Sequence, residues 1–277
     1  MNIGNENIEF IDLDNDKLLV PYFSQISSLF LECFGRTLDK SIWEWAYIAN
    51  PFGSPLVSVV IVDGCMVGHY AVIPMDLTNK LKTVKGYLSM TTMVSASYRR
   101  FGFFQSLAER VYDRITETGL ESIVFGFPNN NSSSGFRKRL GWNISDEFKV
   151  VEVPVSEMKN IADFLENTVI PEAYTLSLSD PLISEWRCKK PGQSWSIDDG
   201  VGSKAFGNVY DLMYLSDPAK LAKLSFDKPV NIILPFKGDN DSNNILKVAF
   251  PYRFGYRCFN MQSIPDFFVQ MCMSDVF

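Results

Sequence analysis

The stretch from Tyr87 to Trp142 constrains the fold of this chain more than any other part of it. It starts with an apolar, β-branched run at 87–94, continues through the loop 99–104, and then places apolar residues at helical spacing up to Gly119. The run 123–127 is short, nearly all apolar and closed by a proline, as in parallel strands that are covered on both faces. This order predicts a right-handed strand, helix and strand unit.

The loop between the first strand and the helix reads Arg99-Arg100-Phe101-Gly102-Phe103-Phe104. It would lie at a helix N-terminus, where free backbone N–H groups and the positive end of the helix dipole attract anions. The two arginines add positive charge at the same place. We therefore expect a phosphate-binding turn here, whereas Lys138 and Arg139 fit a solvated helix face better than a phosphate contact.

These residues resemble a known family. The loop Arg99-x-x-Gly102, followed by Asn130, Ser133 and Phe136 and then by Leu140-Gly141-Trp142, is similar to the GNAT superfamily of acyl-CoA-dependent N-acyltransferases. In that family the loop wraps the pyrophosphate of coenzyme A. The resemblance implies a GNAT fold, a mixed α/β (α+β) structure in which helices flank a central sheet.

The resemblance also implies the chemistry, which is direct transfer of an acyl group from a thioester, most simply acetyl-CoA, to an amine. The backbone around Met93 and Val94 would bind pantetheine and polarise the thioester carbonyl, and Asn130 fits either a pantetheine contact or an ordinary loop and cap. The full set of residues that the resemblance places at the cofactor is Met93, Val94, Arg99, Arg100, Phe101, Gly102, Phe103, Phe104, Asn130, Ser133 and Phe136.

Two positions depart from the family pattern. Phe104 stands where the last loop residue is usually small enough for a phosphate to approach. Arg137 stands where many members carry a tyrosine that acts as the general acid. The usual acid is therefore absent from this sequence.

The proton acceptor is not evident from the sequence either. His69 is the only histidine, and a lone histidine in a strand is more often structural than catalytic. Tyr87, Ser89 and Thr91 alternate along one face of the central strand and could contact the acceptor, but that strand contains no carboxylate. The carboxylates at the end of the chain, including Asp275, and a water-mediated route remain alternatives.

The composition sets further bounds. The 277 residues exceed one domain of about 100–150 residues, 46% are hydrophobic, and no apolar run is long enough for a membrane span. The net charge is 26 − 32 = −6, without a basic block, which disfavours nucleic-acid binding. The start of the chain is acidic where a secretory signal would be basic, so we expect a cytoplasmic protein. Five scattered cysteines without a C-x-x-C pair predict reduced thiols and no metal site.

An internal comparison predicts that the fold occurs twice. Trp43-Glu-Trp45 precedes a Pro-x-Gly break, a strand and the turn Asp63-Gly64, and Glu185-Trp186 precedes a similar break, strand and Asp-Gly turn. Phe254-Gly255-Tyr256 would occupy the place of the Leu-Gly-Trp sequence at 140–142. We therefore expect a GNAT acyl-CoA-binding domain at 1–153 and a degenerate GNAT-like domain at 154–277 that shapes the acceptor site and holds no pyrophosphate.

Three other segments have simpler interpretations. The stretch 153–174, with a helix-like run at 156–167 between prolines, resembles a connector, and the polar run 239–244 a surface loop. Gly200-Val-Gly202-Ser-Lys-Ala205 matches a dinucleotide fingerprint, but the residues after it favour a strand rather than the helix that this motif requires.

The sequence thus predicts an N-acetyltransferase that uses acetyl-CoA as cosubstrate and a small amine as acceptor, as a monomer or homodimer without nucleic-acid or membrane partners. An amino sugar is the preferred acceptor, and polyamines and protein amines remain open. Two alternatives are a Fem-like aminoacyl transferase that uses charged tRNA and a non-catalytic acyl-CoA-binding module.

Overall fold

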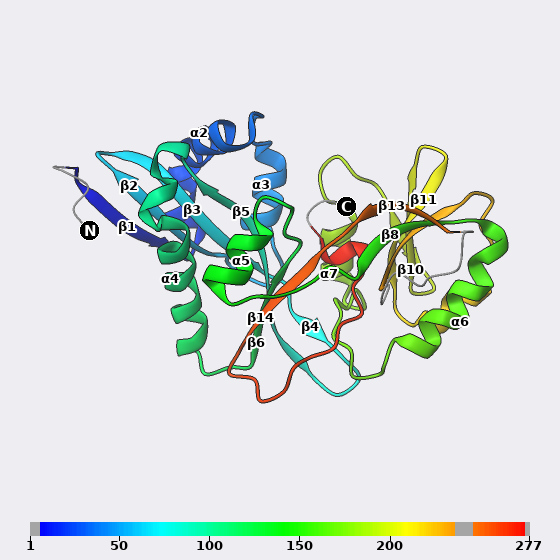
Figure 1. Cartoon of the computed structure of the whole chain (residues 1–277). Helices are drawn as coiled ribbons and strands as arrows, with labels where there is room; N and C mark the ends of the chain where they lie inside the picture. The colour runs from blue at the N-terminus through cyan, green and yellow to red at the C-terminus, as the bar shows by residue number, and fades with distance from the viewer. Residues whose placement is uncertain (1–5, 236–245, 275–277) are drawn as a thin grey trace.

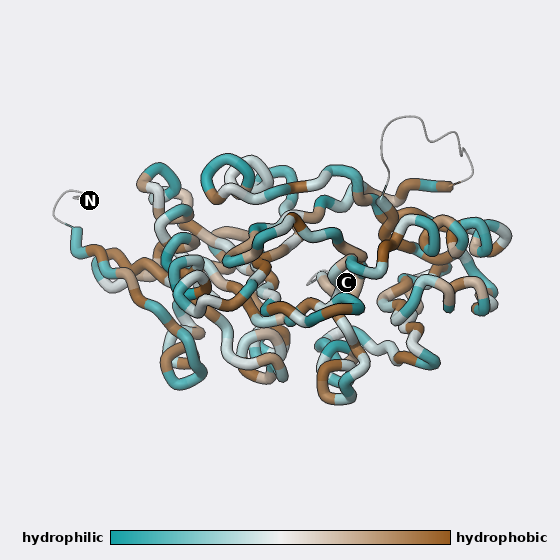
Figure 2. Tube along the Cα trace, turned by 90° about the horizontal axis from the view of Figure 1, so that it is seen from below, coloured by the Kyte–Doolittle hydropathy of each residue, from teal (hydrophilic) through white to brown (hydrophobic). Residues whose placement is uncertain are grey.

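The computed structural model describes residues 6–235 and 246–274. Two β-sheets lie beside one another, and helices pack on both (Figure 1). Hydrophobic segments run through the middle of both halves (Figure 2). The mixed α/β class predicted from the sequence is confirmed. The loop at 239–244 and the carboxylate of Asp275 lie outside the described residues.

The first sheet has eight strands. Seven follow the order β1-β2-β3-β5-β6-β14-β7, and β4 pairs with β5 beside this path. Only β5 and β6 are parallel neighbours. The strands are β1 Ile8–Leu13, β2 Leu56–Val62, β3 Cys65–Pro74, β4 Leu77–Thr78, β5 Thr83–Val94, β6 Ser122–Gly126, β7 Asn143–Ser145 and β14 Phe254–Phe259. Asp63 and Gly64 both have positive φ in the β2–β3 turn, which confirms the predicted hairpin.

The second sheet has the order β13-β8-β12-β11-β10-β9. Its strands are β8 Phe148–Val153, β9 Ser196–Asp198, β10 Val201–Phe206, β11 Val209–Leu215, β12 Val230–Pro235 and β13 Lys247–Pro251. Most of the Gly200–Ala205 motif lies in β10, so the structure confirms that it opens no helix.

Helices cover both faces of the first sheet. Buried side chains of α2 and α3 pack on one face, and those of α4 and α5 on the other. The helices and 3₁₀ turns are α1 Asp16–Leu19, η1 Val20–Tyr22, α2 Phe23–Phe34, α3 Lys40–Tyr47, η2 Ala96–Phe101, α4 Phe103–Glu117, α5 Ser133–Leu140, η3 Val155–Glu157, α6 Met158–Thr168, α7 Pro181–Cys188, η4 Pro218–Lys223 and η5 Met271–Met273.

The helix expected at 156–167 is confirmed as α6, but the segment 153–174 is more than a connector. Met158, Ile161 and Leu165 of α6 are buried against strands β8, β11 and β12. Their spacing of three and four residues gives the helix one apolar face, and this face covers the second sheet.

Six strands of the first sheet have the same order as the six of the second, and each sheet borrows one strand from the other half of the chain. From β2 to β7 and from β9 to β13, the successive pairings are antiparallel, antiparallel, parallel, antiparallel and antiparallel. The fifth strand in each series is exchanged: β14 inserts between β6 and β7, and β8 between β12 and β13. This matching order is what the duplication requires. Phe254–Tyr256 is thus part of a strand of the first sheet and not a second Leu-Gly-Trp sequence.

The exchange bears on the expected division between residues 153 and 154. β8 precedes that point but belongs to the second sheet, and β14 follows it but belongs to the first. The predicted division therefore does not follow sheet membership.

Two tryptophans join the halves with reciprocal hydrogen bonds. The indole N–H of Trp45 donates to the carbonyl of Trp186 at 2.8 Å, and the indole N–H of Trp186 donates to the carbonyl of Trp45 at 2.9 Å. Their rings stack with centroids 4.6 Å apart. These are the residues that the internal comparison pairs, so the contact relates equivalent positions of α3 and α7.

The strand exchange predicts that neither half folds alone. A fragment of residues 1–153 should show no cooperative thermal unfolding by circular dichroism, because β6 and β7 lose their shared partner β14. Coexpression with residues 154–277 should restore a cooperative transition. Cooperative unfolding of the isolated fragment would show that the exchange is not essential.

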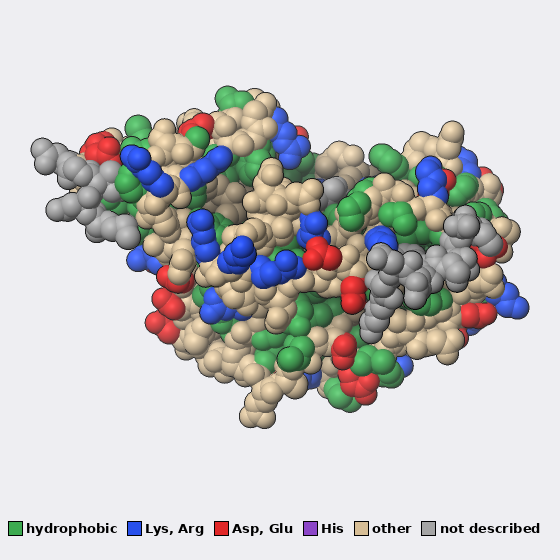
Figure 3. All heavy atoms as spheres, in the orientation of Figure 1, with side chains coloured by type: hydrophobic (Ala, Val, Ile, Leu, Met, Phe, Trp, Pro, Cys, Tyr) green, Lys and Arg blue, Asp and Glu red, His purple; other side chains and the backbone are tan. Residues whose placement is uncertain are grey.

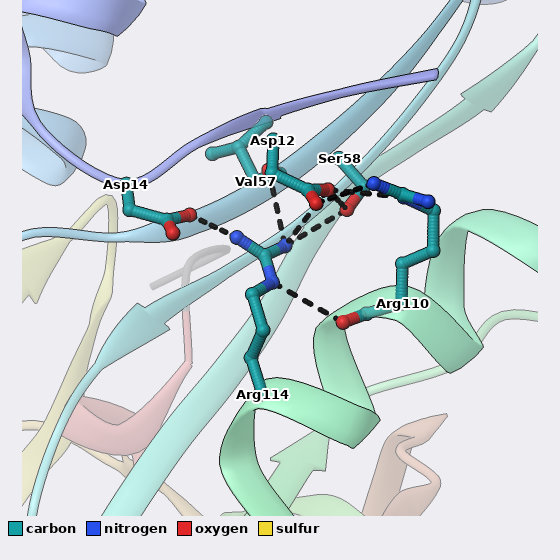
Figure 4. A network of polar contacts seen from close by, with 6 residues as sticks. All are labelled: Asp12, Asp14, Val57, Ser58, Arg110 and Arg114. Carbon is teal, nitrogen blue, oxygen red and sulfur yellow. Dashed lines mark hydrogen bonds and ion pairs between the residues drawn. The ribbon is translucent and has the colours of Figure 1, made fainter. Parts of the chain in front are cut away.

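A charged network fixes α4 to the edge of the first sheet (Figure 4). Asp12 of β1 accepts hydrogen bonds from Arg110 at 3.1 Å and from the Ser58 hydroxyl at 2.6 Å. Arg114 pairs with Asp14 and donates to Ser58 at 2.8 Å. Partial burial alone would raise the pKa of Asp12, but the hydrogen bonds from Arg110 and Ser58 and the two guanidinium charges lower it overall.

The lowered pKa of Asp12 gives a prediction for stability. A carboxyl group whose pKa is lower in the folded state contributes stability above its unfolded pKa, and this is lost as the pH falls through the folded pKa. Asp12→Asn should therefore reduce the free energy of unfolding at pH 7 by about 1–2 kcal/mol. The further fall of this free energy between pH 7 and a pH below about 4 should be smaller in the variant than in the wild type. Urea denaturation at both pH values measures this. Equal losses in variant and wild type would contradict it.

Candidate active site

The first sheet opens where β5 and β6 part. The two strands are paired from Lys85–Ser122 to Leu88–Phe125, but β5 continues to Val94 without β6 beside it. The backbone edge of β5 beyond Leu88 is therefore free of its parallel neighbour. Met93 and Val94, which the sequence places at the cofactor, lie at the end of this edge and are buried.

A bulge reshapes β5 in the same region. Ala71 pairs with Met90 and His69 with Met93, so two residues of β5 oppose only Tyr70 of β3. Thr91, in this bulge, has a φ of 55°. The alternation predicted for Tyr87 and Thr91 on one strand face therefore breaks at Thr91. Tyr87 lies before the opening, paired with Val124, and burial raises the pKa of its phenol.

His69 supports the bulge from the core. Its Nδ1 lies 2.8 Å from the carbonyl oxygen of Thr91, which can only accept, so Nδ1 carries the hydrogen. The side chain is fully buried, and burial lowers its pKa to about 4. A buried neutral imidazole favours a structural role over contact with an acceptor amine.

The predicted anion-binding turn is present at the start of α4. Gly102 has a φ of 80° and links η2 to α4, which has no acidic residue in its first turn. Arg99 and Arg100 are exposed beside it. Basic side chains gather on the face formed by the upper end of α4 and by α5 (Figure 3). The turn thus combines free helix N–H groups with two cations.

The aromatic residues of the turn point away from its amides. Phe104 packs edge-to-face on Phe136 of α5 with centroids 5.4 Å apart, and a Cβ on Gly135 would lie 3.3 Å from the Phe104 ring. Phe103 is buried against Phe10, and Phe101 lies near the guanidinium of Arg100. The large residue at 104 therefore fills the space over α5.

The loop after β6 is held by charged and amide groups. The side-chain oxygen of Asn130 accepts from Arg253, which also pairs with Asp146. Arg137 lies 3.1 Å from Asp146 and donates to the carbonyl of Ile144 at 3.0 Å. The hydrogen bond from Arg253 and then the one from Arg137 lower the pKa of Asp146. Arg137 thus ties α5 to β7 and does not replace an acid.

The remaining candidates and one missed group complete the site. Ser133 is the first residue of α5, and Phe136 is buried within it. Sequence analysis did not identify the buried hydrogen-bonded tyrosines Tyr70 and Tyr112 beside the opening. Tyr112 lies on the apolar face of α4, where periodicity indicates only a core position.

The second half has a similar opening that its own chain fills. β11 and β12 pair only at Tyr210–Val230 and Asp211–Asn231, and β11 continues to Leu215. There the Gln270 side chain accepts from the Leu215 N–H at 2.6 Å and donates to Thr175 at 2.9 Å. This segment occupies the edge that is open in the first half.

Comparison with known proteins identifies the first half. Residues 21–145 match the family model described as an acetyltransferase (GNAT) domain. The match assigns residues 21–145, less than half of the chain, to a GNAT domain. The chemistry of this family is acyl-CoA-dependent N-acetylation. No curated protein matches the chain.

Solved structures share the fold of nearly the whole chain. A probable N-acyltransferase from Enterococcus faecalis has a TM-score of 0.63 at 10% identity, covering 93% of this chain and 74% of that protein. A GCN5-related N-acetyltransferase from Kribbella flavida has a TM-score of 0.60 at 12% identity, covering 93% and 72%. A putative acetyltransferase from Pyrococcus horikoshii has a TM-score of 0.53 at 12% identity, covering 98% and 94%.

Two features are absent from the part of the chain that the structure describes. No group of His, Cys, Asp and Glu within 6–235 and 246–274 could hold a metal ion. Within the same ranges, no helix has the length and apolar character needed to cross a membrane.

Burial of the His69 imidazole predicts how stability and the histidine NMR signal depend on pH. Because its folded pKa is about 4 and its ordinary value 6.5, the unfolded state binds more protons between these values. Stability should therefore be complete above about pH 6.5 and fall by up to about 1.4 kcal/mol per pH unit below it. The single histidine ring resonance in proton NMR should not titrate above about pH 5. A titration midpoint between 6 and 7 would contradict burial of the neutral ring.

Proposed function

We propose that this GNAT protein transfers an acetyl group from acetyl-CoA directly to the primary amine of a small acceptor. The opening of β5 from β6, directly followed by the Arg99–Phe104 turn, carries the proposal. The helix N–H groups after Gly102 would bind the pyrophosphate, and Arg99 and Arg100 would add charge. Asn130, Ser133 and Phe136 would line the cofactor from the α5 side.

The open edge of β5 supports the placement of the thioester. Backbone groups between Leu88 and Val94 that β6 leaves unpaired can bind the amides of pantetheine, as a further strand would. One of these N–H groups, near Met93 or Val94, would polarise the thioester carbonyl. Such a donor stabilises the oxyanion of the tetrahedral intermediate.

The amine would lose its proton through water. His69 is buried, and Tyr87 lies before the opening with a raised pKa. Thr91, half-buried in the bulge, is the better candidate for contact with the acceptor because it lies beyond the point where the strands part.

The second half would form one wall of the acceptor site. Tyr252, just before β14, stacks on Phe127 at the end of β6 with centroids 4.8 Å apart. The Tyr252 hydroxyl bonds to Ser274, one of the last described residues. We propose that an amino sugar is the acceptor, with polyamines and protein amines as the competing substrates in an amine panel.

Two other functions remain candidates. A Fem-like transferase would bind charged tRNA, which the net charge of −6 and the turn at Arg99–Gly102 disfavour. A non-catalytic acyl-CoA-binding module is favoured by Arg137, which is engaged with Asp146. Calorimetry with acetyl-CoA distinguishes the proposed acetyltransferase from a Fem-like transferase, because a Fem-like protein should not bind acetyl-CoA. Release of the CoA thiol with any amine of the panel distinguishes the acetyltransferase from a non-catalytic module, which should bind acetyl-CoA without turnover.

Gly102→Asp tests the cofactor site against a matched control. The variant should weaken acetyl-CoA binding by about a hundredfold, because a carboxylate would repel the phosphates beside it. Gly119→Asp, at the other end of α4, has a comparable φ of 69° and equally open space, so it controls for backbone strain and charge. Calorimetry should show unchanged affinity for this control. Equal affinities of the two variants would refute the placement of the cofactor.

A further inference from the structure

A chain of four buried or half-buried polar groups leads to the opening between β5 and β6. The indole N–H of Trp142 donates to the Tyr112 hydroxyl at 2.8 Å, and that hydroxyl lies 2.8 Å from the hydroxyl of Tyr70. The Ser89 hydroxyl donates to Tyr70 at a longer 3.2 Å. Ser89 is the first residue of β5 beyond the last pair with β6.

These four groups have more donor hydrogens than there are hydrogen bonds among them. One indole N–H and three hydroxyl groups supply four donor hydrogens, and within the described part of the chain these groups make three hydrogen bonds with one another. When Ser89 donates to Tyr70, one tyrosine hydroxyl hydrogen therefore has no acceptor among the four groups. A buried donor without a partner is costly.

The Ser89 end is the more accessible place for an additional acceptor. Trp142, Tyr112 and Tyr70 are buried, whereas Ser89 is half-buried. If each hydroxyl turns, Trp142 donates to Tyr112, Tyr112 to Tyr70 and Tyr70 to Ser89, so that every group has an acceptor except Ser89. Its O–H is then directed away from Tyr70, where an external acceptor would complete the chain.

Backbone packing places this end beside the opening. A Cβ on Gly126, the last residue of β6, would lie 3.2 Å from the carbonyl oxygen of Ser89 and 3.5 Å from the Trp142 ring. Ser89, Gly126 and Trp142 therefore meet where the two strands begin to part. Tyr70 and Tyr112 lie in the core on the α4 side, the side that carries the Arg99–Phe104 turn.

We propose that the Ser89 hydroxyl donates a hydrogen bond to the sulphur of coenzyme A as it leaves. This inference rests on the proposed transferase function. The amine nitrogen forms a bond to the carbonyl carbon, the carbon–sulphur bond breaks, and the sulphur keeps the electron pair as a thiolate. The proton of the amine goes to water, and Ser89 keeps its own proton. Its hydrogen bond replaces the stabilisation that a tyrosine at position 137 would provide.

Comparison of CoA with desulpho-CoA tests this contact without turnover. By calorimetry, the wild type should bind CoA about tenfold more tightly than desulpho-CoA, and Ser89→Ala should reduce that ratio to about one. Ser28→Ala, whose hydroxyl bonds only within its own helix at 2.9 Å, should keep the wild-type ratio. If the wild type and Ser89→Ala show the same ratio, the proposal is wrong while the cofactor site stands. If the wild type binds neither ligand, both proposals fail.

Steady-state kinetics separates this role from a structural one. Ser89→Ala should lower kcat by about tenfold to a hundredfold and leave KM for acetyl-CoA within about twofold. Tyr70→Phe, which removes the inward partner, should lower kcat less and keep some preference for CoA. A rise in KM with unchanged kcat in Ser89→Ala would overturn the assignment.

Discussion

The separation of β5 from β6 after Leu88 is the constraint on which the candidate site depends. Parallel neighbours normally satisfy one another's backbone groups, so an open edge needs support from elsewhere in the structure. The bulge opposite Tyr70 bends β5, and the buried His69 ring holds its Thr91 carbonyl at 2.8 Å. The strand thus reaches the Gly102 turn with an edge that an extended ligand can occupy.

The second half shows what happens to the same opening without a phosphate turn. There β11 also parts from its parallel neighbour, but Gln270 binds the free N–H of Leu215. The same stretch of chain that closes this opening follows β14, which completes the first sheet. The exchange therefore links the two openings. β14 completes the first sheet, and the segment that follows β14 fills the opening beside β11 in the second sheet. Within the described residues, this arrangement leaves the open edge of β5 as the candidate cofactor site and closes the corresponding edge of β11.

Local patterns in the sequence predicted the elements around the site but not the long-range pairings. The apolar run at 87–94, the Asp63-Gly64 turn and the periodicity after Phe104 each depend on neighbouring residues, and all three are confirmed. β14 pairs with β6 across more than a hundred residues, which no local pattern encodes. In the same way, the sequence shows only that Arg137 stands where the family pattern has a tyrosine, whereas the structure shows its ion pair with Asp146. The helix at 156–167 was predicted from its local pattern, but its packing was not, because the sheet that it covers is built from strands far away in the sequence.

The chain of hydroxyl groups joins structure to chemistry at this opening. Its members come from three elements and one loop, since Tyr112 lies on α4, Tyr70 on β3, Ser89 on β5 and Trp142 between α5 and β7. Burying two phenols stabilises a fold only if both find partners, so the chain fixes these elements in one arrangement. Burial raises the pKa of Tyr112 to about 12 and that of Tyr70 well above its ordinary value. The phenols therefore stay protonated at neutral pH and act by orienting their neighbours. Because the hydrogen bonds of Tyr70 orient the Ser89 hydroxyl, the contacts that hold the walls of the opening also set the direction of this hydroxyl.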